Sequence, residues 1–141
     1  MLCKKTFNDS MDDILCKLMK KGAQINFKGE FGITPLMMAC YFNDIELLSF
    51  LIGQNAKLDI TNEDGDTPLS IAAYFNNAEI VKALVKQKPN EKNHKKNNYN
   101  ESPLTIAETM GNKEIIDILR FYFEGILYYY FINVKNDIKN K

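Results

Sequence analysis

The stretch Thr67-Pro68-Leu69-Ser70-Ile71-Ala72 decides the fold, because two related stretches occur elsewhere in the chain. The earlier copy reads Thr34-Pro35-Leu36-Met37-Met38-Ala39, and the later one reads Ser102-Pro103-Leu104-Thr105-Ile106-Ala107. The first two copies start 33 residues apart, and the last two start 35 residues apart. A period in this range is typical of a stacked repeat array, in which each unit buries its apolar face only against its neighbours.

Each copy of the motif predicts the start of a helix. A hydroxyl residue stands directly before a proline, so its side-chain oxygen can cap free backbone amides, while proline in the first helical position loses no hydrogen bond. We expect these helices to stop near Asn43, Asn76 and Gly111, residue types that tolerate the left-handed backbone of a helix end. Apolar residues then recur at helical spacing within 45–52 and 80–85, which predicts a second amphipathic helix.

Short polar segments connect the repeats. Residues 24–32 and 57–66 contain few core residues and carry glycines among polar side chains, which is the composition of a projecting turn. We expect these segments to form hairpin-like fingers. The predicted fold class is therefore all-α: a solenoid of stacked helix-turn-helix units joined by β-hairpin-like loops.

These residues resemble the ankyrin repeat family, whose signature is Thr-Pro-Leu-His-x-Ala with a period near 33 residues. Gly32 and Gly65 lie two residues before the threonines, and segments 22–26 and 55–59 resemble the family's Gly-Ala-Asp-Val-Asn ending. The resemblance covers about residues 11–120. It implies a surface for binding another protein, built from the fingers and the exposed side of the first helices.

The chain departs from the family at one position of the motif. Met37, Ser70 and Thr105 stand where the resemblance implies histidine. We therefore expect the usual hydrogen bond to the neighbouring threonine to be absent at Met37 and altered at the other two positions. The departure affects local stability and leaves the predicted fold unchanged.

The repeat register predicts how the chain is divided. An N-terminal capping repeat is expected because residues 13–23 align with the second helix of a repeat, while no Thr-Pro pair precedes them. The predicted divisions are a capping repeat at 1–30, a repeat at 31–63, a repeat with a loop insertion at 64–98, a C-terminal repeat at 99–123, and an aromatic, Lys/Asn-rich tail at 124–141.

The aromatic segment that follows Leu119 has three alternative interpretations. It can form an extended helix that caps the open end of the stack, an interfacial membrane anchor, or a second protein-docking patch. Asp117, Arg120 and Glu124 interrupt its apolar residues, and a membrane-spanning helix needs about 20 of them. A peripheral membrane-associated protein, anchored through this segment, is the alternative function.

Composition disfavours several classes of function. The 18 basic and 18 acidic residues give a formal net charge of +0, which makes nucleic acid an unlikely partner. Charges interrupt the first twenty residues, so no secretory signal is expected and a cytoplasmic location is predicted. The basic residues Lys92, Lys95 and Lys96 beside Tyr99 are read as a solvated loop, with an acidic partner or an RNA backbone as the alternative.

The chain shows no pattern of a catalytic or metal site. It has no glycine-rich phosphate loop and no nucleophile elbow, and its single histidine, His94, has no ligand partner at suitable spacing. Cys3, Cys16 and Cys40 lack paired spacing and are interpreted as buried thiols. A calcium loop around Asp64 would need a glutamate at position 71, which is isoleucine. We predict no enzyme, no metal, no cofactor and no small-molecule substrate.

The predicted site is a surface that binds a partner protein. Tyr41-Phe42-Asn43 and Tyr74-Phe75-Asn76 repeat the same tripeptide 33 residues apart, and exposed, clustered aromatic rings are typical of interface hot spots. In the alternative interpretation the phenylalanine rings join the core and only the tyrosine edges reach solvent. The predicted contacts are Tyr41, Phe42, Tyr74 and Phe75, with Phe27, Phe31, Asn62 and Asp66 from the fingers. We expect a monomeric adaptor or scaffold.

Overall fold

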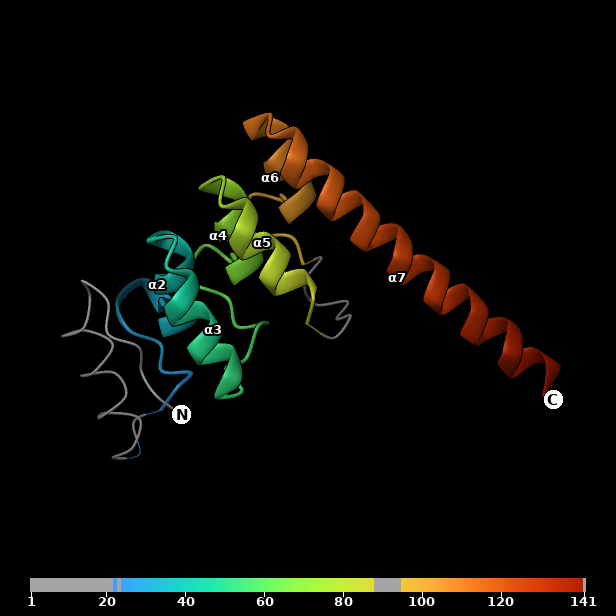
Figure 1. Cartoon of the computed structure of the whole chain (residues 1–141), viewed down its shortest axis with the longest axis horizontal. Coiled ribbons are helices and arrows are strands. Elements are labelled where there is room, and N and C mark those ends of the chain that lie inside the picture. Colours follow the sequence, from blue (N-terminus) through green and yellow to red (C-terminus); the bar gives the residue numbers. More distant parts are fainter. Residues whose placement is uncertain (1–21, 23, 88–94, 141) are drawn as a thin grey trace.

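The computed structural model describes residue 22 and residues 24–87 and 95–140, which form an open stack of helical hairpins (Figure 1). The short 3₁₀ turn η1 (Glu30–Gly32) precedes them. The first helices of the hairpins are α2 (Pro35–Tyr41), α4 (Pro68–Tyr74) and α6 (Pro103–Met110), and the second helices are α3 (Ile45–Gly53), α5 (Ala78–Val85) and α7 (Lys113–Lys139). The described ranges contain no strand, so the all-α prediction is confirmed. Most of the predicted capping repeat lies outside them.

The helices form two layers. In one layer α4 contacts both α2 and α6, and in the other α5 contacts both α3 and α7, as Figure 1 shows. Each hairpin therefore buries its apolar residues partly against its own second helix and partly against the next hairpin.

The core runs along the whole stack without interruption. The alanines that close the motif copies, Ala39, Ala72 and Ala107, are fully buried, and their small side chains leave room for the neighbouring helix. Large side chains of the second helices fill the space between the layers: Leu48, Leu51, Ile80, Leu84, Ile115 and Leu119. Each of these six residues is at most 2 % exposed.

The motif starts its helices as predicted. The hydroxyl of Thr34 accepts a hydrogen bond from the backbone N–H of Met37, and the corresponding oxygens of Thr67 and Ser102 do the same one and two repeats later. Where the family has histidine, the hydrogen bond to the neighbouring hydroxyl is altered at Ser70 and Thr105 and absent at Met37, as expected. The Ser70 hydroxyl lies 3.2 Å from that of Thr67, and the Thr105 hydroxyl lies 2.9 Å from that of Ser102, whereas Met37 is fully buried.

The first helices also end where the sequence predicts. A residue with a left-handed backbone follows each helix within two positions. These residues are Asn43 (φ 54°) after α2, Asn76 (φ 63°) after α4 and Gly111 (φ 75°) after α6. Asparagine and glycine adopt this conformation at little cost, so the chain can turn directly into the second helix.

The predicted hairpin-like fingers are turns whose ends are joined by backbone hydrogen bonds. The N–H of Asn62 donates to the carbonyl of Asp66 (3.0 Å), and the N–H of Asn97 donates to the carbonyl of Glu101 (2.9 Å). The fingers are also bonded to one another, because Glu63 N–H donates to the carbonyl of Phe31 (3.0 Å). The equivalent bond joins Asn98 N–H to the carbonyl of Asp64 (2.8 Å).

Gly65 lies where two fingers approach each other closely. Its backbone has φ +80°, and a Cβ atom there would lie 3.1 Å from the backbone nitrogen of Asn98 and 3.2 Å from Cα of Asn97. Gly32 has the same relation to the next finger, with φ +74° and a distance of 3.0 Å to the nitrogen of Glu63. Glycine is therefore required both by the backbone angle and by the neighbouring chain.

The helix α7 is longer than a repeat requires. It contains 27 residues, runs without interruption through the predicted division between 123 and 124, and continues straight past the other helices (Figure 1). Ile126 is buried, but the described side chains after it are exposed. The segment is helical, as the capping alternative requires. Its distal half does not fold over the open end of the stack, so that alternative is wrong for those residues.

Replacing Gly65 by alanine tests the contact between fingers, and Gly111→Ala is its matched control. Both positions have φ near +80°, but a Cβ at Gly111 meets nothing within 4 Å. We expect Gly111→Ala to lower the free energy of unfolding by about 1 kcal/mol through backbone strain. Gly65→Ala should cost about 1–3 kcal/mol more, because the next finger must also move. Urea unfolding followed by circular dichroism measures both, and equal losses would show that the fingers are not in close contact.

Candidate functional site

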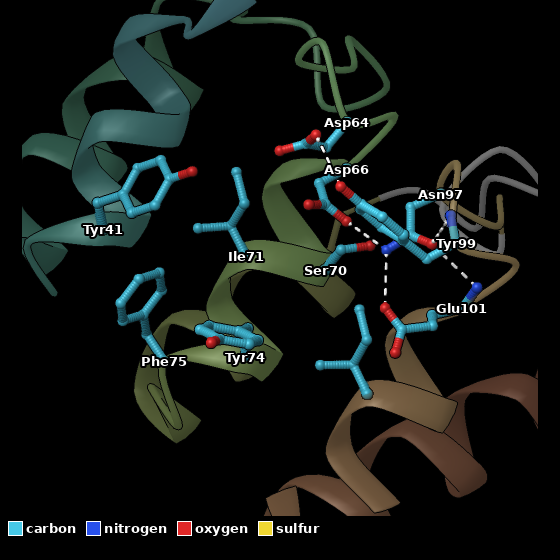
Figure 2. Close-up of a pocket in the computed structure, with 11 residues that line it drawn as sticks. Tyr41, Asp64, Asp66, Ser70, Ile71, Tyr74, Phe75, Asn97, Tyr99 and Glu101 are labelled. Carbon is cyan, nitrogen blue, oxygen red and sulfur yellow. Dashed lines mark hydrogen bonds between the residues drawn. The ribbon is translucent and has the colours of Figure 1, made fainter. Parts of the chain in front are cut away.

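The fingers and first helices line an open-sided cavity of about 260 Å³ (Figure 2). Side chains from all three hairpins line it, because the stacking of repeats places equivalent positions side by side. The lining residues are Tyr41 from α2; Ser70, Ile71, Tyr74 and Phe75 from α4 and its end; Asp64 and Asp66 from one finger; Asn97, Tyr99 and Glu101 from the next; and Ile106 from α6.

Three of the four predicted helix aromatics contact one another beside this cavity. The ring of Phe75 lies 5.1 Å from that of Tyr41 and 5.1 Å from that of Tyr74, edge to face in both pairs. Tyr74 is 55 % exposed and Phe75 44 %, whereas Tyr41 is half-buried against the core. Phe42 is 73 % exposed. The alternative in which the phenylalanines join the core is therefore wrong, and Tyr41 is the most buried of the four.

The predicted finger aromatics are exposed but lie outside the lining of the cavity. Phe27 is 62 % exposed and Phe31 65 % exposed. Phe31 also has a left-handed backbone (φ 56°), which bulky residues adopt rarely. Both rings remain available on the finger of the first hairpin.

The prediction that Asn62 lines the surface is wrong. Its side chain is buried, because its Oδ1 accepts hydrogen bonds from the backbone N–H groups of Asp64 (3.0 Å) and Asp66 (2.9 Å). These bonds shape the finger from inside. Asp66, the other predicted polar contact, is half-buried and lines the cavity.

Sequence reasoning missed the third finger as part of the site. Asn97 repeats the role of Asn62, with its Oδ1 accepting from the backbone N–H groups of Tyr99 and Glu101. Its Nδ2 donates to Asp66 Oδ1 (2.9 Å) and to Glu101 Oε2 (3.1 Å), and the Tyr99 hydroxyl donates to Asp64 Oδ1 (3.4 Å). Counting 35 residues from Asn62 would have found Asn97, but the inserted basic residues hid this register. The sequence groups Tyr99 with the basic loop, but its side chain lies against the acidic finger and lines the cavity.

The cavity has a negative electrostatic character. Burial raises the pKa of Asp66, the negative charges of Asp64 and Glu101 add to this increase, and the hydrogen bonds from Asn97 and Asn62 oppose it. Burial also raises the pKa of Tyr41, a side-chain hydrogen bond with Asn62 opposes this increase, and the charges of Asp66 and Asp64 add to it. Each of these groups therefore feels the repulsion of the neighbouring carboxylates.

The described residues offer little for catalysis or metal binding. Within them, no group of three His, Cys, Asp or Glu side chains is arranged to hold a metal ion. Cys40 is fully buried, and burial raises the pKa of its thiol to about 12. Cys3, Cys16 and His94 lie outside the described residues. No helix in the described part of the chain has the length and apolar character needed to cross a membrane.

The fold and this surface define a helical repeat solenoid with a row of fingers beside its first helices. The family model for ankyrin repeats (3 copies) matches residues 1–93 and also residues 36–128. The chain belongs to the ankyrin repeat family, whose members are generally non-catalytic modules of protein–protein interaction. A comparison with curated proteins found no match.

The pKa of Cys40 predicts an unreactive thiol. In a Cys3→Ser, Cys16→Ser variant, Cys40 is the only thiol, and its raised pKa keeps it protonated and unreactive at pH 8. We expect Ellman's reagent to react at least about 100-fold more slowly with the folded protein than with the protein in 6 M guanidinium. Absorbance at 412 nm measures the reaction. Fast reaction of the folded variant would contradict the buried position of this thiol.

The raised pKa of Asp66 predicts how stability depends on pH. The folded protein holds the Asp66 proton more tightly than the unfolded chain, so the ionised carboxylate costs stability at pH 7, and this cost disappears as the pH falls below the ordinary value of 3.8. We expect Asp66→Asn, which keeps an oxygen for the Asn97 amide, to gain up to about 0.5 kcal/mol at pH 7. The gain should vanish near pH 3.5. Urea unfolding at both pH values checks this, and a gain that grows on acidification contradicts it.

Proposed function

We propose that this chain is a non-catalytic adaptor or scaffold that binds another protein through its fingers and first helices. The observation that carries the proposal is the exposure of aromatic rings on the fingers and at the ends of the first helices. Tyr74 and Phe75 contact each other, and Phe31, Phe42 and Tyr99 are exposed as well. Exposed aromatic rings bury a large area on binding and lose little rotamer entropy, so they are common in interface hot spots.

The size of the cavity also favours a protein partner. Pockets for drug-sized ligands usually measure about 300–1,000 Å³, and they bury most of the ligand. The cavity between the fingers and α4 measures about 260 Å³. At this size, just below that range, the cavity has room for one side chain of a larger partner.

A double variant on α4 and its end tests this function. Tyr74→Ala with Phe75→Ala removes two adjacent exposed rings, and neither residue belongs to the fully buried core. Proteins captured from cell lysate by the wild-type chain are identified by mass spectrometry, and the strongest is then titrated against both purified proteins by calorimetry. We expect the double variant to bind that partner at least about 30-fold more weakly, because hot-spot truncations cost about 2 kcal/mol or more.

Phe121→Ala is the matched control. Phe121 is 81 % exposed on α7, away from the fingers, so its removal should leave the affinity unchanged. Circular dichroism and the melting temperature must show that every variant is folded. Unchanged affinity in the Tyr74, Phe75 variant would count against this surface. Loss of binding in the control alone would move the contact to α7.

A further inference from the structure

The cavity combines aromatic rings with acidic side chains. Among its lining residues, Asp64, Asp66 and Glu101 are acidic, and none is lysine, arginine or histidine. Lys82 forms ion pairs with Glu79 and Glu114, and Arg120 forms one with Glu108, and none of these residues lines the cavity. The cavity therefore has negative charge that no side chain of the described residues neutralises.

The aromatic part of the lining is arranged around these carboxylates. Figure 2 shows that Tyr41 and Tyr74 come from two different helices and that Tyr99 reaches over from the third finger. Tyr99 is 68 % exposed, and its hydroxyl already donates to Asp64. The rings thus present faces and edges to the same space into which the acidic groups project.

We propose that this cavity, the tyrosine–carboxylate pocket, binds one arginine side chain of the partner protein. The inference rests on the proposed protein-binding function and specifies the chemistry that the partner must provide. A guanidinium group stays charged at every relevant pH, stacks on aromatic rings and donates paired hydrogen bonds to carboxylates. A planar cation of this kind matches both parts of the lining, whereas a neutral or acidic side chain matches only one or none.

The hydrogen bonds within the pocket leave it ready for such a ligand. Asn97 donates to one oxygen of Asp66 and to one oxygen of Glu101, which fixes the positions of both carboxylates without neutralising them. The pocket therefore bears the repulsion between its carboxylates before the ligand arrives, and a bound cation relieves it. Preorganised groups of this kind lose little entropy on binding.

The test uses the whole chain labelled with ¹⁵N and two small probes that differ in charge. Nα-acetyl-arginine-N-methylamide carries the guanidinium, and Nα-acetyl-citrulline-N-methylamide is its neutral analogue of nearly equal shape. We expect the arginine probe to shift the amide signals of Gly65, Tyr74 and Tyr99 in two-dimensional NMR spectra. The citrulline probe should bind at least about tenfold more weakly, because it lacks the charge.

Asp64→Asn with Asp66→Asn removes two charges and keeps the oxygen atoms that accept hydrogen bonds from Tyr99 and Asn97. This variant should bind the arginine probe at least about tenfold more weakly and remain folded. Glu46→Gln with Glu124→Gln removes the same charge from exposed positions on α3 and α7 and should bind as the wild type does.

Equal binding of the two probes, shifts that map away from the fingers, or no shift at all would overturn the proposal. Unchanged binding by the Asp64, Asp66 variant would overturn it as well. The proposed function can fail separately. If the Tyr74, Phe75 variant loses the captured partner while the Asp64, Asp66 variant retains it, the docking surface stands and the arginine pocket is wrong.

Discussion

The stability of each helical hairpin depends on its packing against the next hairpin. α4 is buried between α2 and α6, and its motif alanine and isoleucine contact neighbours in place of solvent. A single hairpin such as 35–53 or 68–85 has too little apolar surface to offset the entropy of ordering its backbone. The same stacking that stabilises the helices also brings the fingers into backbone contact, so the surface and the core have one origin.

Much of the fold follows from residues whose preferences are local. The hydroxyl before each proline and the asparagine or glycine after each first helix decide where helices start and stop, and both were predictable because capping and left-handed backbone depend on residue type alone. The course of α7 was not predictable in this way. Aromatic residues after Leu119 are compatible with a cap, an anchor or an exposed helix. Only the tertiary structure shows that the described side chains after Ile126 are exposed. The cytoplasmic location and the monomeric state remain predictions.

The site was only partly predictable for a related reason. Aromatic residues at equivalent positions of two repeats indicated a surface row, and Tyr74 and Phe75 do lie there. Asn62 was misplaced because a polar residue in a turn can serve either the solvent or the backbone, and the choice depends on three-dimensional hydrogen bonding. The third finger was missed because an insertion shifted its register by two residues. Its Asn97, Tyr99 and Glu101 turn an aromatic surface into an acidic, aromatic pocket.

At one position the third finger differs from the first two, with asparagine in place of glycine. Gly32 and Gly65 each leave open the space that the following finger occupies, but the equivalent position in the third finger is Asn100, also with a left-handed backbone (φ 64°). Asn100 is exposed and carries the Cβ atom that the two glycines lack. A further finger in the same register would meet this Cβ at the backbone distances found at Gly32 and Gly65, which are 3.0 and 3.1 Å. The third finger therefore lacks the residue type that permits close backbone contact between the first fingers.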